Sequence, residues 1–175
     1  EDRRNIEQQY GTLARGMAYP FGTYSNEVIA CLEKCGICYS RTVKPSFDFK
    51  FPANWLEWNP TCHHNNSRLM EFAKKFVEEK CRFSSDNWLF YVWGHSYEFD
   101  NNDNWEVIEK FAEYVGGKDD IWYATNIEIY NYVNAYDNLE YSLDMTRVHN
   151  PSAIDIWLRH EENTVHIPAG ATIEL

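Results

Sequence analysis

The stretch LARGMAYPFGTYSNEVIACLEKCGICYSRTV, residues 13–43, decides the expected fold because it encodes a strand, a helix and a second strand in succession. An apolar run opens the stretch and ends in a turn that contains Pro and Gly. Ser25 or Asn26 then offers an N-cap for an amphipathic helix, which Gly36 ends. Residues 37–43 follow as the next strand. Two strands joined by a helix are typical of a parallel pair.

Working outward, strand and helix alternate four times between about Leu13 and Tyr136. We expect Ser67 to cap the clearest helix, whose apolar residues recur at helical spacing: Leu69, Phe72, Ala73, Phe76 and Val77. Further strands are expected at 88–93 and 121–124. The pattern predicts an α/β fold: a distorted, incomplete (β/α) barrel of mainly parallel strands, in which one sheet joins the segments near Tyr19, Tyr39, Tyr91 and Tyr123.

The C-terminal residues change character. Apolar residues alternate at Ile154, Ile156 and Leu158, and a polar turn follows at 161–163. Alternation of this kind is typical of a β-hairpin. We therefore expect a (β/α) domain over residues 1–137 and a small β appendage over residues 138–175.

Composition excludes some classes of function. Of the 175 residues, 16 are Lys or Arg and 27 are Asp or Glu, so the net charge of −11 argues against a nucleic-acid partner. Apolar runs are too short for a membrane span, which needs about 20 residues. Five cysteines are an odd number, which favours reduced thiols and a cytoplasmic location. We interpret Cys31, Cys35 and Cys38 as buried free thiols rather than as zinc ligands.

Two expected strand ends carry residues suited to catalysis. Tyr19-Pro20-Phe21-Gly22 lies just before a helix, where backbone N–H groups could hold an oxyanion; an ordinary turn is the alternative. His95 follows a strand and has acidic neighbours, so it suits general acid chemistry; a structural histidine is the alternative.

Two other segments offer binding residues. His63 and His64 adjoin Cys62 and could hold zinc, although neighbours on an extended strand point to opposite faces, so that at most one of the pair would face a site. Trp55 and Trp58 lie in a long loop and could line a groove for sugar rings, with burial in the core as the alternative.

The order of several segments resembles the polysaccharide deacetylase family, the NodB-homology carbohydrate esterases. The segments are DRRNIE, GMAYPFGTYSNEVIACLEKCGICYSRT, WNPTCHHNN, LFYVWGHSYEFD and DDIWYATNIEIYNYV, which together span about residues 1–135. The resemblance implies a distorted (β/α) barrel that hydrolytically removes acetyl groups from N- or O-acetylated carbohydrates with a divalent metal, commonly zinc.

Site residues follow from the matched motifs. The resemblance makes His95 the general acid, Phe21 the backbone donor to the oxyanion, and Trp93 part of the acetyl-methyl pocket. We also expect the substrate, an acetylated sugar or oligosaccharide, to contact Tyr19, Pro20, Gly22 and Trp58.

The chain departs from the family in two ways. Ala18 stands where most members have an Arg, and the Asp-Asp and His-x-x-x-His motifs that bind the family's metal are missing. We therefore expect residues 1–175 to be the C-terminal part of a deacetylase, with little activity alone and a barrel completed by an oligomer or a companion chain. The alternatives are a metal-free carbohydrate-binding module and a degenerate subunit.

Overall fold

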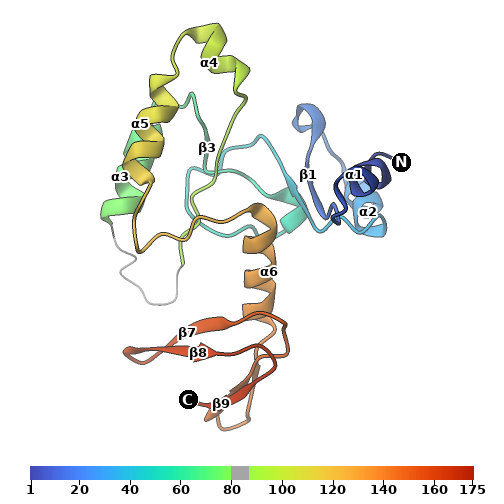
Figure 1. The fold of residues 1–175 in the computed structure, drawn as a ribbon, viewed down its shortest axis with the longest axis vertical. Coiled ribbons are helices and arrows are strands. Elements are labelled where there is room, and N and C mark those ends of the chain that lie inside the picture. Colours follow the sequence, from blue (N-terminus) through green and yellow to red (C-terminus); the bar gives the residue numbers. More distant parts are fainter. Residues whose placement is uncertain (80–86) are drawn as a thin grey trace. The chain divides into compact units, whose positions relative to one another are not determined.

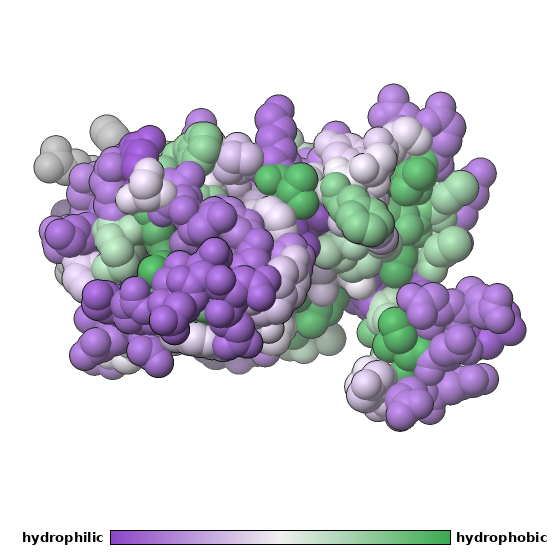
Figure 2. Space-filling model, turned by 90° about the horizontal axis from the view of Figure 1, so that it is seen from above, coloured by the Kyte–Doolittle hydropathy of each residue, from purple (hydrophilic) through white to green (hydrophobic). Residues whose placement is uncertain are grey.

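The computed structural model describes residues 1–79 and 87–175. These residues form two compact units, Glu1–Trp122 and Tyr123–Leu175, and each is described by itself (Figure 1). Within the described ranges, no helix combines the length and the apolar character needed to span a bilayer. Hydrophilic residues cover most of the face seen in Figure 2, in keeping with a chain in which 25% of the residues are charged.

The N-terminal unit begins with the strand–helix–strand expected for residues 13–43. Helix α1 (Asp2–Tyr10) precedes strand β1 (Gly16–Ala18), and a short 3₁₀ turn, η1 (Pro20–Gly22), leads into helix α2 (Asn26–Lys34). The Ser25 hydroxyl accepts a hydrogen bond from the Val28 N–H, so Ser25 is the N-cap of α2. Strand β2 (Tyr39–Arg41) then pairs with β1 in parallel, with Ala18 opposite Arg41.

A second parallel pair lies further along this unit. Strand β3 (Cys62–His63) follows the 3₁₀ turn η2 (Trp55–Glu57) and precedes helix α3 (Leu69–Glu78). Strand β4 (Val92–Trp93) pairs with β3 so that His63 lies opposite Trp93. Two helices complete the unit, α4 (Tyr97–Asn102) and α5 (Glu106–Val115).

The expected incomplete barrel is wrong. Among the described residues, β1–β2 and β3–β4 are separate two-stranded sheets, and two further small sheets are antiparallel. An isolated bridge joins Arg41 to Trp58, but Pro60 has no N–H with which to continue pairing toward β3. Residues 121–124 form no strand, and Trp122 and Tyr123 are 59% and 54% exposed. Strands this short provide too few ladder bonds to build one continuous sheet.

An aromatic cluster makes up the core beside the second strand pair. Phe49, Cys62, Leu69 and Phe72 are buried together, with partly buried side chains packed around them: Phe76, Trp88, Phe90, Val92, Val107 and Phe111. The Phe49 ring lies 5.1 Å from that of Trp88 and 5.3 Å from those of Phe76 and Phe90. These contacts pack the amphipathic face of α3 against β3 and the segment that leads into β4.

The C-terminal unit consists of one helix and two small antiparallel sheets. Helix α6 (Asn126–Asp137) begins with a capping box formed by Thr125 and Glu128. Strands β5 (Glu140–Tyr141), β6 (Arg147–His149) and β9 (Thr172–Glu174) form one sheet in the order β5-β6-β9. Strands β7 (Ile156–His160) and β8 (Asn163–Ile167) form the expected hairpin.

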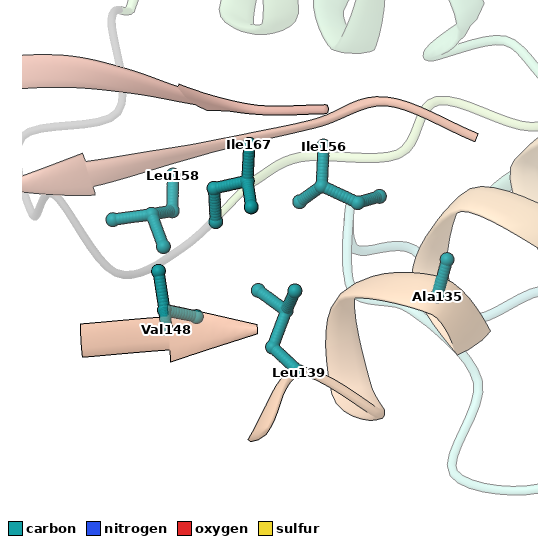
Figure 3. Close-up of a cluster of buried hydrophobic side chains, with 6 residues drawn as sticks. All are labelled: Ala135, Leu139, Val148, Ile156, Leu158 and Ile167. Atoms are coloured by element: carbon teal, nitrogen blue, oxygen red, sulfur yellow. The ribbon is translucent and has the colours of Figure 1, made fainter. Parts of the chain in front are cut away.

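The core of this unit is a cluster of six buried side chains, shown in Figure 3: Ala135, Leu139, Val148, Ile156, Leu158 and Ile167. Ala135 lies on α6, and the Tyr132 hydroxyl of the same helix accepts a hydrogen bond from the Trp157 N–H at 3.1 Å. Helix α6 therefore packs with the C-terminal strands. The boundary between the units falls at Trp122/Tyr123, whereas the sequence pattern placed it at 137/138.

The four cysteines within the described residues are free thiols with contrasting environments. Cys31 on α2 and Cys35 at its C-cap are exposed, contrary to the expectation of burial, and Cys38 is half-buried. Cys62 is fully buried, and burial raises the pKa of its thiol to about 11. Cys81 lies outside the described residues.

We predict that iodoacetamide at pH 8 modifies Cys31 and Cys35 in the native protein but leaves Cys62 unmodified. Alkylation needs an accessible thiolate, and Cys62 is neither exposed nor ionised at that pH. Peptide mapping by mass spectrometry measures the modification, and labelling in guanidinium chloride is the control. Equal labelling of Cys62 before and after denaturation would contradict the burial described here.

We predict that Ile156→Ala lowers the free energy of unfolding of the C-terminal unit by about 2–5 kcal/mol, because it leaves a cavity in a packed core. Ile154→Ala is the matched control: this side chain is 37% exposed and should cost less than about 1 kcal/mol. Urea titration combined with hydrogen exchange at the β7 and β8 amides measures both. Equal losses of unfolding free energy in the two variants would contradict the burial of Ile156 in this core (Figure 3).

Candidate functional site

A side-chain contact joins the C-terminal ends of the two parallel pairs. Arg41 ends β2, Trp93 ends β4, and the Arg41 guanidinium lies 4.2 Å from the centre of the Trp93 ring. A cation over an indole face is an attractive contact. Functional side chains gather at such strand ends because the loops that follow parallel strands emerge on the same side. We call the group Arg41, His63, His64, Trp93, His95 and Glu98 the strand-end site.

Three imidazoles surround one carboxylate oxygen in this site. The Oε2 atom of Glu98 lies 3.2 Å from Nε2 of His63, 3.3 Å from Nε2 of His64 and 3.6 Å from Nδ1 of His95. Glu98 belongs to the first turn of α4, and the same oxygen accepts a hydrogen bond from the backbone N–H of His95 at 3.1 Å. The helix that follows β4 thus places the Glu98 carboxylate beside His63, at the end of β3, and His64, which follows it.

Both adjacent histidines reach Glu98 because the strand ends between them. β3 stops at His63, and a turn closes when the Asn66 N–H donates to the His63 carbonyl at 3.0 Å. The His64 N–H donates to the Trp93 carbonyl at 2.8 Å, which continues the pairing with β4 by one more bond. Side chains alternate between faces only along extended backbone, so the expectation that at most one of the pair faces a site does not hold here.

His64 occupies space that a side chain at position 94 would need. Its side chain is 4% exposed, and its ring packs 4.3 Å from that of Phe99. A Cβ atom built on Gly94 would overlap the His64 imidazole. The glycine before His95 is therefore required by close packing rather than by an unusual backbone angle.

Burial and neighbouring charges set the protonation states. Burial lowers the pKa of His64, and the nearby His63 adds to the shift, so His64 is held neutral at pH 7. Burial by itself would raise the pKa of Glu98. The His95 N–H and the surrounding imidazoles outweigh that effect, and the pKa of Glu98 is lowered. A neutral, buried imidazole therefore faces an ionised carboxylate.

Trp93 forms one wall of the strand-end site. The His63 ring meets it edge-on at 4.6 Å, and the His95 ring lies 5.7 Å away. Its indole Nε1 is buried and has no hydrogen-bond partner among the residues that the structure describes. A buried donor without a partner is uncommon in proteins.

The Tyr-Pro-Phe-Gly turn follows β1 at the end of the first strand pair. Phe21 has φ 56° and ψ 11°, Gly22 has φ 72°, and the Phe21 ring is fully exposed. The left-handed region is costly for a phenylalanine, and such strain often occurs at functional turns. Pro20 begins the turn.

Tyr19 and Trp58 lie in the interior. Tyr19 is 3% exposed, and its hydroxyl donates a hydrogen bond to the Leu56 carbonyl at 2.8 Å. Trp58 is 1% exposed and packs against three rings: Tyr39, Trp55 and Tyr91. Neither ring presents a face on which a sugar could stack.

Sequence reasoning missed the contribution of two side chains. Arg41 carried no motif, and its contact with Trp93 joins segments far apart in the chain. Glu98 was seen only as an acidic neighbour of His95. Its position three residues after His95, at the start of a helix, was the available signal, because that spacing returns a side chain toward the preceding turn.

Comparisons of the chain with protein-family models, curated proteins and solved structures return no match. The resemblance to polysaccharide deacetylases therefore stays a prediction that rests on the motifs themselves.

We predict that Gly94→Ala costs about 1–3 kcal/mol of stability, because the added methyl group collides with the His64 ring. The matched test is a double-mutant cycle with His64→Ala, measured by urea unfolding. Removing the ring makes room, so the cost of Gly94→Ala should largely disappear in that background. An unchanged cost would show that His64 does not fill this space.

Proposed function

We propose that the strand-end site takes part in the hydrolytic deacetylation of an N- or O-acetylated carbohydrate, with His95 as the general acid. The observation that carries the proposal is the setting of His95. Its side chain is 48% exposed, so it can meet a substrate, and its Nδ1 lies 3.6 Å from the carboxylate of Glu98. A carboxylate beside an imidazole orients the ring, and a proton donor must be held in a fixed direction toward the group that it protonates.

Two further features support the same reaction. The Trp93 ring offers an apolar wall beside His95, suited to the methyl group of an acetyl substituent. The strained turn at Phe21 exposes backbone that, by the resemblance, donates its N–H to the oxyanion. In this proposal water attacks the acetyl carbonyl carbon, and the turn stabilises the charge on the carbonyl oxygen. His95 protonates the departing amine or alcohol as its bond to the acetyl carbon breaks, and acetate is released.

The residues present do not fit the metal site of the deacetylase family. That site uses an Asp-Asp motif and a His-x-x-x-His motif, and residues 1–175 contain no early Asp-Asp and no His-x-x-x-His spacing. The histidines near Glu98 are instead adjacent in sequence. We therefore derive no catalytic step through the family's metal.

A sugar-binding module is the second candidate, and one observation favours it. The Tyr97 ring is 57% exposed and stacks 5.1 Å from that of His95, next to the proposed site. Exposed aromatic rings are suited to pack against the apolar faces of sugars. Such a module would bind oligosaccharides without releasing acetate.

We predict that His95→Gln lowers kcat for acetate release by about 10²–10⁴-fold while sugar binding is retained. The assay measures acetate from chito-oligosaccharides and acetylated xylan with the natural gene product, and calorimetry measures binding. His166→Gln, in the C-terminal unit, is the control and should leave kcat unchanged. Sugar binding without acetate release in the unaltered protein would favour the binding module, and neither activity would overturn both candidates.

A further inference from the structure

Three donor atoms converge on a single point beneath the strand ends. One ring nitrogen of His63, one ring nitrogen of His64 and a carboxylate oxygen of Glu98 all lie within 4.8 Å of one another. The two nitrogen-to-oxygen separations are 3.2 and 3.3 Å. In a tetrahedral zinc site with bonds of about 2.0–2.1 Å, neighbouring ligand atoms are about 3.3 Å apart. The two nitrogen-to-oxygen separations therefore match the edge of a zinc coordination tetrahedron, and the two nitrogens lie within 4.8 Å of each other.

We propose that His63, His64 and Glu98 bind a divalent metal ion of the zinc type. Two imidazoles and one carboxylate are a donor set that leaves a fourth position open for water or a ligand. Imidazole favours zinc, cobalt and iron(II), whereas calcium and magnesium prefer oxygen donors alone. This inference does not rest on the proposed function, because binding of the metal is measured without a sugar.

The surroundings orient the donors as a metal site requires. Nδ1 of His63 lies 2.7 Å from Oδ1 of Asn65 and accepts a hydrogen bond from the Asn65 backbone N–H at 3.3 Å, so Asn65 fixes the ring with Nε2 facing Glu98. When Nε2 binds a metal, the Asn65 amide oxygen can accept the proton on Nδ1. The ring of His64 is fixed from two sides, by Gly94 and by the Phe99 ring. Ligands held in place before the ion arrives lose less conformational entropy on binding.

The geometry differs from that of an ordinary surface ion pair. His166 and Asp155 form such a pair in the C-terminal unit, with one imidazole on one carboxylate at 2.8 Å and side chains that are 46% and 45% exposed. At Glu98, two imidazoles share one oxygen, and one of them is only 4% exposed. His95 flanks the cluster at 3.6 Å and stays outside the group of three donors.

Cys62 does not join the donor set. It precedes His63 on β3, and its side chain lies in the apolar cluster with Phe49, Leu69 and Phe72. The strand thus directs a thiol into the core and an imidazole toward Glu98, as alternation along extended backbone requires. Among the described residues, the donors of the site are therefore nitrogen and oxygen atoms.

The test measures binding of Zn²⁺ alone by calorimetry and of Co²⁺ alone by its visible absorption bands. We expect one equivalent of metal. Glu98→Gln and His63→Gln should each weaken binding by more than about 100-fold, because outer partners alone are worth about 10- to 100-fold. Asn65→Ala should weaken binding by about 10-fold, and Asn65→Asp should retain it. His166→Gln is the matched control and should bind as the unaltered protein does.

The test replaces His63 rather than His64, because the His63 side chain is 20% exposed and that of His64 only 4%, so replacing His63 disturbs less packing. Absence of Co²⁺ bands in the unaltered protein, or equal Zn²⁺ affinity in Glu98→Gln, would overturn the proposal and leave a hydrogen-bonded carboxylate. Loss of acetate release with metal binding intact would instead count against the proposed function alone.

Discussion

The parallel pairing of β3 with β4 is the constraint on which the strand-end site depends. This pairing sets His63 opposite Trp93. The His64 N–H then donates to the Trp93 carbonyl, so the pairing continues up to Gly94. Because β4 leads directly into α4, the same pairing determines where Glu98 returns. A shift of one residue would place Cys62, a core side chain, where an imidazole now faces the carboxylate.

So short a pair cannot hold itself together by hydrogen bonds alone. The aromatic cluster around Phe49 supplies the remaining stabilisation by packing α3 and the approach to β4 on one side of the pair. The Arg41–Trp93 contact ties the first strand pair to the second. Apolar burial thus stabilises a frame that is itself too irregular to be a continuous sheet.

The site combines groups with different requirements. His64 is neutral and buried, whereas His95 is half exposed, yet both lie near one ionised carboxylate. The difference in exposure separates two tasks that the proposals assign: a fixed imidazole suits a metal ligand, and an accessible one suits a proton donor. Because Glu98 lies beside both His64 and His95, a change in its charge alters the electrostatic environment of both imidazoles.

Local patterns in the sequence determined the strand–helix–strand over residues 13–43, the amphipathic helix α3 and the hairpin of β7 and β8, since periodicity and caps act between near neighbours. They also identified His95 and both adjacent histidines as candidates. Only the tertiary structure decided that the strands stay in separate small sheets, because sheet formation depends on pairing between distant segments and on donors such as the one that Pro60 lacks. Only the tertiary structure also placed both His63 and His64 beside Glu98. The strand ends at His63 and a turn begins, so the alternation of side chains between the two faces does not continue to His64.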